Sequence, residues 1–219
     1  MKLLNTDSKL QLVIFDLDGV LVDACEWHRV AFNQALREIS DYEISEQEHI
    51  EIYNGLPTAK KLDMLNLKGI VNINDNSLIH NRKQQITMDL INEGLRPDLS
   101  KIELMKWLKD RKYNICCFTN SISRTASLML EKCGVLNYLH TVVTNEDVKN
   151  PKPSPEGYNN LINKYKVNPR QCMIVEDSPK GVAAAVDSGA IVMKVKNATE
   201  VTKDNLERFI NENFDSNGW

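Results

Sequence analysis

Four carboxylates, a hydroxyl and a lysine accompany the short apolar runs of this 219-residue sequence. In chain order they are Asp16, Asp18, Thr119, Lys152, Glu176 and Asp177. Crowded carboxylates repel one another, and burying them is costly unless a cation intervenes. A hard divalent cation such as Mg²⁺ removes that repulsion, takes few protein carboxylates and leaves room for phosphate oxygens. The residue types therefore favour magnesium-assisted chemistry at a phosphate.

The same residue types suit the transfer of a phosphoryl group. The charge of such a group lies on its equatorial oxygens, which are stabilised by a metal, a lysine and hydroxyl or backbone donors. An aspartate can attack phosphorus and form an acyl phosphate, which splits one hard step into two. A second acid two residues further on can protonate the leaving oxygen and then deprotonate the attacking water. Each residue alone could be a solvated turn, a helix cap or a surface charge, so the prediction depends on their joint order.

Short continuous apolar runs supply the strands that would position these residues. The runs are 12–15, 115–118, 142–143, 173–175 and 191–193. Continuous apolar runs are typical of strands buried on both faces of a parallel sheet. Helical patterns lie between them, so the alternation predicts a doubly wound α/β sheet. In such a sheet ligands bind beyond the carboxyl ends of the strands, where the acids, Thr119 and Lys152 would meet.

Local signals place the ends of the helices. Ser100 and Glu103 have the spacing of a capping box, and Ser154 is placed to cap a helix that starts at Pro155. A helical pattern runs over 123–133, and Gly134 follows it as a stop signal. An alanine-rich helix is expected over 180–188, before Gly189.

The interval between the first and second strands is too long for one helix. It contains four helical patterns and no convincing strand: 26–39, 45 to about Gly55, 57–65 and 77–93. We therefore expect a small all-helical domain inserted after the first strand. The α/β core would comprise residues 1–22 and 97–219, and the helical insertion residues 23–96. The alternative is one larger, continuous α/β domain.

Composition narrows the function classes. With 27 basic and 30 acidic residues the net charge is −3, which excludes a broad basic surface for nucleic acid and argues against binding an anionic membrane. No apolar run approaches the roughly 20 residues of a membrane helix, and the first residues lack a signal-peptide pattern. The five cysteines are scattered and contain no CxxC pair. They read as reduced thiols, so we expect a cytoplasmic protein.

The sequence resembles the haloacid dehalogenase superfamily. The matching pieces, in order, are Asp16-Leu17-Asp18-Gly19-Val20-Leu21-Val22-Asp23, Thr119-Asn120-Ser121, Lys152-Pro153 and Glu176-Asp177-Ser178. The resemblance implies a Rossmann-like core, a helical cap in the position of the insertion, and Mg²⁺-dependent phosphoryl transfer. Within the superfamily, Asp18 argues against a true dehalogenase and against a phosphonoacetaldehyde hydrolase, which carry other residues at that place.

The resemblance also implies roles for individual residues. Asp16 resembles the nucleophile and Asp18 the general acid and base. Thr119 and Lys152 resemble the residues that hold the phosphate. The metal shell would consist of Asp16, the backbone of Asp18, Glu176 and Asp177. Gly19 and Asn120 are expected at the substrate-binding edge, although Asn120 could instead simply turn the chain.

Among the branches of the superfamily, the sequence is most similar to the β-phosphoglucomutase-like one. His28, in Glu26-Trp27-His28, resembles a histidine of the closed site, and Lys83 resembles part of a basic pair on the last cap helix. Both could instead be ordinary surface or core residues. The mutase has an arginine in its cap loop that holds the second phosphate. Here Thr58 occupies that place, unless Lys60 or Lys61 substitutes, and this departure argues against mutase activity.

We therefore predict a Mg²⁺-dependent phosphohydrolase that acts on a small phosphorylated metabolite, a sugar-phosphate-like monoester, through an aspartyl phosphate. The closest alternative is a phosphosugar mutase, which shares this chemistry. A phospho-receiver signalling domain and a non-catalytic binding protein are remoter alternatives. No nucleic-acid or membrane partner is expected. We expect a monomer, with a dimer as the alternative.

Overall fold

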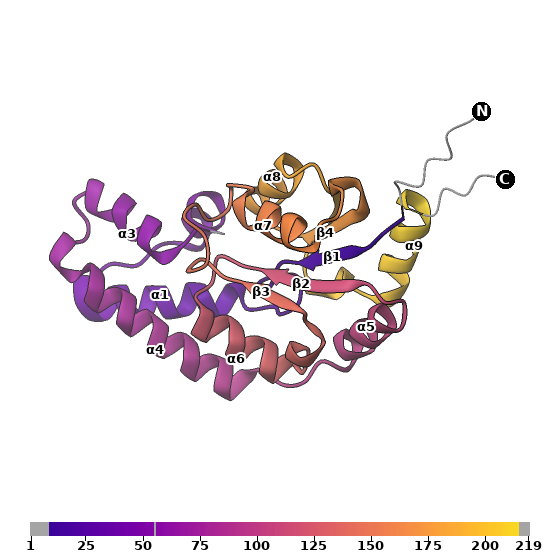
Figure 1. Cartoon of the computed structure of the whole chain (residues 1–219). Coiled ribbons are helices and arrows are strands. Elements are labelled where there is room, and N and C mark those ends of the chain that lie inside the picture. Colours follow the sequence, from indigo (N-terminus) through magenta and orange to yellow (C-terminus); the bar gives the residue numbers. More distant parts are fainter. Residues whose placement is uncertain (1–8, 55, 215–219) are drawn as a thin grey trace, which may run out of the picture.

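A parallel five-stranded sheet forms the centre of the computed structural model, which describes residues 9–54 and 56–214 (Figure 1). The strand order is β3-β2-β1-β4-β5, and every neighbouring pair is parallel. The strands are β1 (Leu12–Phe15), β2 (Asn114–Phe118), β3 (Thr141–Val143), β4 (Cys172–Glu176) and β5 (Ile191–Lys194). The predicted doubly wound α/β fold is confirmed, and each predicted apolar run lies within a strand.

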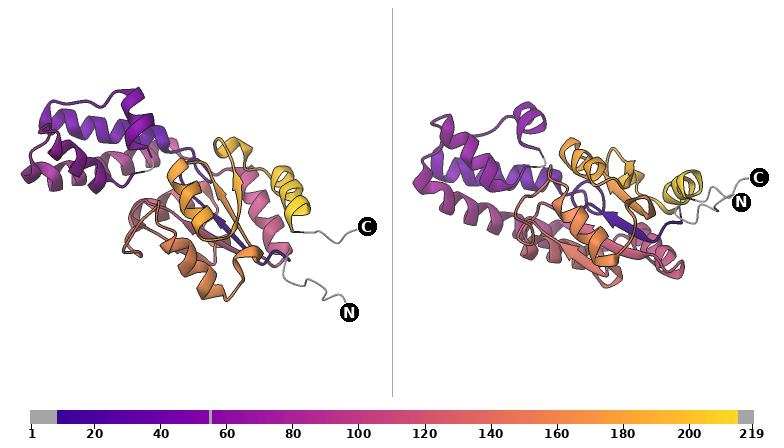
Figure 2. Two further views of the ribbon diagram at one scale, coloured as in Figure 1. Left: turned by 90° about the horizontal axis from the view of Figure 1, so that it is seen from above. Right: turned by 45° about the horizontal axis from the view of Figure 1, so that its top comes forward.

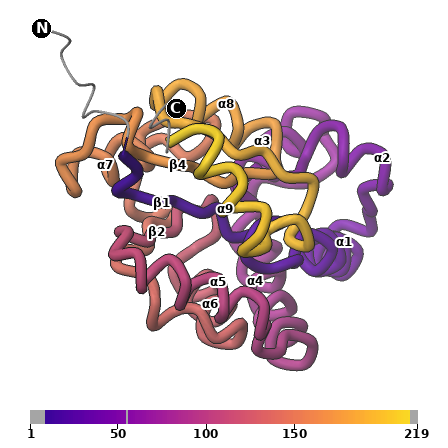
Figure 3. Tube along the Cα trace, turned by 90° about the vertical axis from the view of Figure 1, so that its right-hand side faces the viewer, coloured from indigo at the N-terminus to yellow at the C-terminus, as the bar shows by residue number. Residues whose placement is uncertain are grey.

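Helices cover both faces of the sheet, as the apolar runs require (Figures 1 and 3). Successive residues of β1 alternate between the two sides: Val13 and Phe15 join one apolar core, and Leu12 and Ile14 join the other. The first core is closed by α5 (Leu99–Asp110), α6 (Ser123–Cys133) and α9 (Lys203–Asn213). The second is closed by α7 (Glu156–Tyr165) and α8 (Pro179–Asp187).

The stretch between β1 and α5 is helical and has an apolar core of its own. Its helices are α1 (Cys25–Ser40), α2 (Glu46–Glu48), the π-helix η2 (His49–Tyr53), α3 (Thr58–Leu67), the 3-10 turn η3 (Ile73–Asp75) and α4 (Asn76–Gly94). Figure 2 shows this group, hereafter the cap, beyond one end of the sheet. The predicted stop at Gly55 lies outside the described residues, and the exact division at 22/23 and 96/97 stays a prediction. None of the described helices, the 19-residue α4 included, is apolar enough over its length to cross a membrane.

Three helix starts in the α/β core differ from the prediction. The expected capping box at Ser100 is wrong, because Asp98 caps α5 and accepts hydrogen bonds from the backbone N–H groups of Ser100 and Lys101. Helix α7 begins at Glu156, one residue later than predicted, although the Ser154 hydroxyl still accepts its first N–H. Helix α8 begins at Pro179, one residue earlier, with Ser178 as its cap. These shifts are local, because in each case a neighbouring polar residue or a proline can also start the helix.

Candidate active site

A cavity of about 150 Å³ lies between the carboxyl edge of the sheet and the cap. Its sheet side, the name used here for the loops that follow β1, β2 and β4 and the loop that carries Lys152, contributes most of the predicted residues. These are Asp16, Asp18, Thr119, Asn120, Lys152 and Asp177. Its cap side consists of residues from α1, η2, α3 and α4, including His28, Lys61 and Lys83. The topology thus brings residues more than 130 positions apart into contact, as for Asp16 and Lys152.

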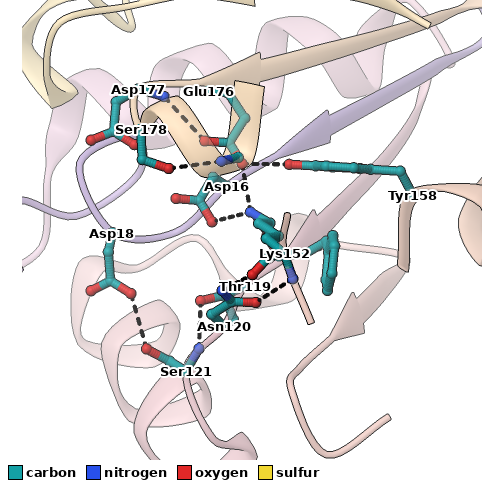
Figure 4. A network of polar contacts seen from close by, with 12 residues as sticks. Asp16, Asp18, Thr119, Asn120, Ser121, Lys152, Tyr158, Glu176, Asp177 and Ser178 are labelled. Carbon is teal, nitrogen blue, oxygen red and sulfur yellow. Dashed lines mark hydrogen bonds and ion pairs between the residues drawn. The ribbon is translucent and has the colours of Figure 1, made fainter. Parts of the chain in front are cut away.

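Lys152 ties two of the predicted carboxylates together (Figure 4). Its ammonium donates to Oδ1 of Asp16 and to Oε1 of Glu176, at 2.6 Å each, and to the backbone oxygen of Phe118 at 2.8 Å. The Tyr158 hydroxyl donates to the same Oε1 of Glu176 at 2.6 Å. All of these side chains are buried. Charge-assisted hydrogen bonds between buried groups fix the position of Asp16 before a substrate binds.

This cluster carries more negative charge than Lys152 can balance. Burial, together with Glu176, Asp18 and Asp177, raises the pKa of Asp16 well above its usual value, and Lys152 only partly opposes this. Burial alone would lower the pKa of Lys152, but Asp16 and Glu176 outweigh it and raise that pKa. Burial and the neighbouring Glu176 also raise the pKa of Asp177 to about 7. The sheet side therefore favours the binding of additional positive charge.

Asp18 belongs to a separate hydrogen-bonded chain that reaches into the cap. Its two carboxylate oxygens accept from Nε2 of His28 at 2.9 Å and from the Ser121 hydroxyl at 3.0 Å. Lys83 lies 3.0 Å from Nδ1 of His28. A charged lysine can only donate, so Nδ1 accepts and the proton of the imidazole lies on Nε2, toward Asp18. Burial alone would raise the pKa of Asp18, but His28 and these hydrogen bonds lower it.

The residues after β2 organise the loop around Lys152. Asn120 accepts from the backbone N–H of Lys152 at 3.0 Å and donates to its backbone oxygen at 3.2 Å. Thr119 is buried, and its hydroxyl oxygen accepts from the backbone N–H of Ser121. Asn120 therefore holds the Lys152 loop against the end of β2. Asn120 also lines the cavity, which is compatible with the predicted contact with substrate; that contact stays a prediction.

Three acidic side chains form a group that could hold a metal ion. Oxygens of Asp16, Glu176 and Asp177 lie within 4.8 Å of one another. Among the described residues, Oδ1 of Asp177 is the buried side-chain oxygen that has no hydrogen-bond partner. Both oxygens of Glu176 already accept hydrogen bonds, and the carboxylate of Asp18 lies outside the group. An oxygen-only donor set with one unpartnered buried oxygen fits a hard divalent cation.

Gly19 makes this arrangement sterically possible. It has a φ of +83°, and a Cβ atom there would lie 2.1 Å from Oδ2 of Asp177. Any side chain would thus displace the carboxylate, while glycine adopts this conformation without strain. Gly19 therefore leaves the space that the Asp177 carboxylate occupies. The predicted contact of Gly19 with substrate stays a prediction.

Sequence reasoning missed Tyr158 and underrated Lys61. No motif pointed to Tyr158, which comes from α7 and reaches Glu176 across the second core. The sequence resemblance offers Lys61 only as a substitute for the missing arginine, on equal terms with Lys60. The structure separates these two lysines: Lys61 is buried and lines the cavity, whereas Lys60 is exposed. A signal was available, since Lys61 lies one turn before the apolar Leu65 on the inward face of α3.

A parallel sheet with a helical cap and an acidic carboxyl edge defines a class of α/β enzymes. The sequence profile of the haloacid dehalogenase-like hydrolases matches residues 13–195. The chain belongs to this family and is an enzyme of it, as the motifs predicted.

Individual proteins of the family are similar to this chain at moderate sequence identity. The chain is 28% identical to a phosphorylated carbohydrates phosphatase of Thermotoga maritima over 82% of each chain. It is 25% identical to a β-phosphoglucomutase of Bacillus subtilis over 85% of this chain and 83% of that one. The crystal structure of a β-phosphoglucomutase from Clostridium difficile superimposes with a TM-score of 0.79 at 20% identity, covering 93% of this chain and 98% of that one. At that identity the structure bears on the fold alone.

Proposed function

We propose that the protein is a Mg²⁺-dependent phosphohydrolase that cleaves a small phosphorylated metabolite, a sugar-phosphate-like monoester, through a phosphorylated Asp16. One arrangement of side chains carries the proposal. At one edge of the sheet, Asp16 is held by Lys152 and lies close to Asp177, which has an oxygen without a hydrogen-bond partner. Asp18 lies at the same edge but has separate hydrogen-bond partners, His28 among them. Membership of the hydrolase family and the similarity to a carbohydrate-phosphate phosphatase support it.

In the first step the Asp16 carboxylate attacks phosphorus. A bond forms between an Asp16 oxygen and phosphorus, the ester bond breaks, and the leaving oxygen takes a proton from Asp18. Lys152 and the Thr119 hydroxyl would hold the phosphoryl oxygens. In the second step Asp18 takes a proton from water, and the water oxygen forms a bond to phosphorus. The bond between the Asp16 oxygen and phosphorus breaks, which restores the Asp16 carboxylate and releases inorganic phosphate.

Asp18 must be protonated in the first step although its pKa is lowered in the structure. A phosphate brings negative charge next to Asp18, and a like charge raises the pKa of a carboxyl group. Substrate binding thus favours the acid form when it is needed. The hydrogen bond from His28 keeps the carboxylate oriented in either state.

The metal would be held by Asp16 and Asp177, with Glu176 behind them and the Asp18 backbone as a further predicted donor. When bound, Mg²⁺ supplies positive charge that stabilises the phosphate oxygens as charge builds up on them. The cap encloses the site, and closure over the substrate would exclude bulk water from the acyl phosphate. The cytoplasmic location and the monomeric state stay predictions.

Phosphate release across a panel of phosphorylated metabolites, with Mg²⁺ or with EDTA, tests the proposal. We expect chelator-sensitive release from a few compounds, restored by added Mg²⁺. Release that is unaffected by EDTA, or no release at all, would contradict the proposal. Incubation with β-glucose 1-phosphate and a trace of the bisphosphate separates the mutase: glucose 6-phosphate as the product would indicate a mutase, and inorganic phosphate a hydrolase.

A further inference from the structure

Tyr158 is a buried tyrosine of α7 whose hydroxyl reaches the acidic cluster without lining the cavity. Its side chain is fully buried, and the hydroxyl donates to Oε1 of Glu176 at 2.6 Å. A carboxylate only accepts hydrogen bonds, so the proton of this contact comes from Tyr158. Neither Tyr158 nor Glu176 lines the cavity. Any effect of Tyr158 on the reaction must therefore pass through another side chain.

Lys152 is the side chain that connects Glu176 to the cavity. The same oxygen of Glu176 accepts from its ammonium at 2.6 Å, and the ammonium also donates to Oδ1 of Asp16 at 2.6 Å and to the backbone oxygen of Phe118 at 2.8 Å. An ammonium has three protons, so every donor of Lys152 is already in use. Lys152 can therefore bind a phosphate oxygen only by giving up one of these hydrogen bonds.

Two aromatic rings lie next to the ammonium of Lys152. The ring centres of Phe118 and Tyr158 lie 4.8 and 5.2 Å from it, and the two rings meet edge to face at 4.9 Å. Such contacts attract a cation through the electrons of the ring. They help to keep the ammonium in place, and the competing oxygens around it decide where it donates (Figure 4).

The two carboxylates compete for Lys152 on unequal terms. The side chain of Glu176 is 0% exposed and that of Asp16 is 10% exposed, and the attraction between charges is stronger where water is excluded. Glu176 alone would thus bind the ammonium more strongly than Asp16 does. The hydroxyl of Tyr158 is a second donor to the same oxygen of Glu176 and withdraws part of its negative charge. The other oxygen accepts the backbone N–H of Asp177 at a longer distance, 3.2 Å, so Tyr158 is the stronger neutral donor to this carboxylate.

We propose that Tyr158 is a positioning residue: its hydroxyl weakens the hold of Glu176 on Lys152 and so lets the ammonium turn to a phosphoryl oxygen at Asp16. When Lys152 turns, Tyr158 remains a partner of the buried Glu176 carboxylate, so this charge keeps a donor. The inference rests on the proposed function, in which Lys152 holds the phosphate. It deepens that function by assigning a task to a side chain outside the cavity.

Tyr158→Phe in the full-length protein isolates the contribution of the hydroxyl, because it keeps the ring next to Lys152. Tyr165→Phe is the matched control: Tyr165 lies on the same helix, and its hydroxyl forms a hydrogen bond with Thr141 at 2.8 Å, at the start of β3. Glu176→Gln and its combination with Tyr158→Phe complete a double-mutant cycle, since the amide keeps an oxygen for Lys152 but not the charge. The readouts are the Kd for inorganic phosphate with Mg²⁺, by titration calorimetry, and the kinetics of p-nitrophenyl phosphate hydrolysis.

We expect Tyr158→Phe to raise the Kd for inorganic phosphate about 10-fold, the size of change that follows when a hydrogen bond to a charged group is weakened. KM for p-nitrophenyl phosphate should rise by a similar factor, whereas kcat should change less than about threefold. In the Glu176→Gln background the same substitution should change the Kd less than about twofold, because the competing charge is gone. Tyr165→Phe should match the wild type in every readout.

With an active wild type, three results would overturn the inference alone: unchanged Kd and KM in Tyr158→Phe, an equal change with and without the charge of Glu176, or a loss confined to kcat. The last is what a lower folded fraction would produce. Thermal unfolding of each variant therefore sets the temperature of the measurements, well below the lowest midpoint. No phosphate release by the wild type, from p-nitrophenyl phosphate or from any compound of the metabolite panel, would instead overturn the proposed function, and the inference with it.

Discussion

The sheet side and the cap side of the cavity differ in sign of charge and in how far that charge is compensated within the protein. On the sheet side Asp16 and Glu176 share Lys152, and Asp18 has His28 and Ser121. On the cap side, no carboxylate of the described residues lies within ion-pair distance of the Lys61 ammonium, which lies over the Phe32 ring. The side chains of the sheet side are thus held in place by one another before a substrate binds. The cap side depends on the substrate, which suits the part of a site that selects it.

Polar contacts connect the two sides. The hydrogen-bonded chain from Asp18 through His28 to Lys83 joins the loop after β1 to the cap helices α1 and α4. Gln84 of α4 accepts from the Thr125 hydroxyl of α6 at 3.1 Å, and Lys180 of α8 donates to the backbone oxygen of Asn54 at 2.7 Å. The arrangement of Asp18 therefore depends on a cap that lies against the sheet.

The largest expected effect comes from removing the nucleophile on the sheet side. Asp16→Asn should lower phosphate release roughly 10³-fold or more, because a neutral amide cannot attack phosphorus. The fold should survive, since the amide keeps the shape and can still accept a hydrogen bond from Lys152. Initial rates and circular dichroism check this. Activity within tenfold of the wild type would rule out Asp16 as the nucleophile.

Next in size is the loss of the central cation. Lys152→Met leaves the buried carboxylates of Asp16 and Glu176 without the cation that they share, so we expect the free energy of unfolding to fall by about 3–5 kcal/mol. Urea denaturation at pH 7, followed by tryptophan fluorescence, measures this. Added Mg²⁺ should restore part of the loss if the acids hold a cation. A change in the free energy of unfolding below about 1 kcal/mol would mean that groups other than Lys152 stabilise the two carboxylates.

The same substitution on the cap side should act in the opposite direction. A folded-state pKa of about 7 lies below the roughly 10.4 of an unfolded lysine, so the unfolded state binds more protons between these values. The charge of Lys61 thus destabilises the ligand-free protein fully below about pH 7, and this cost disappears as the pH rises toward 10.

Lys61→Met should therefore be more stable than the wild type by about 2 kcal/mol at pH 6, with little difference near pH 10. Denaturation of both proteins across this range, with Lys60→Met in parallel, measures the difference. A variant that is less stable than the wild type at pH 6 would show that Lys61 is compensated within the protein.

The smallest expected effect comes from weakening one link between the sides. Lys180→Met removes the hydrogen bond to Asn54, at a cost of about 1 kcal/mol in the free energy of unfolding. We expect KM to rise no more than about fivefold and kcat to stay the same, because the reacting groups are untouched. Steady-state kinetics check this. A large loss of kcat would make this contact essential to the catalytic arrangement.

The strands of the sheet and the acids at its edge could be predicted from the amino-acid sequence. Continuous apolar runs identify buried parallel strands, and the carboxyl ends of such strands meet at one edge, so Asp16, Asp18 and Asp177 could be placed together without coordinates. The helical character of the stretch between β1 and α5 followed from its apolar periodicity in the same way. These are local signals, read within a few residues of each position.

Which side chains have partners could not be predicted in this way, because it depends on how distant segments pack together. Lys60 and Lys61 are adjacent in sequence but about 100° apart around α3, so packing of that helix sends one to solvent and the other to the cavity. The contact of Tyr158 with Glu176 likewise joins α7 to β4. The periodicity of α3 is enough to place Lys61 on the inward face with Leu65. What a side chain meets there depends on how whole helices are oriented by the apolar faces they bury, and no short stretch of sequence contains that information.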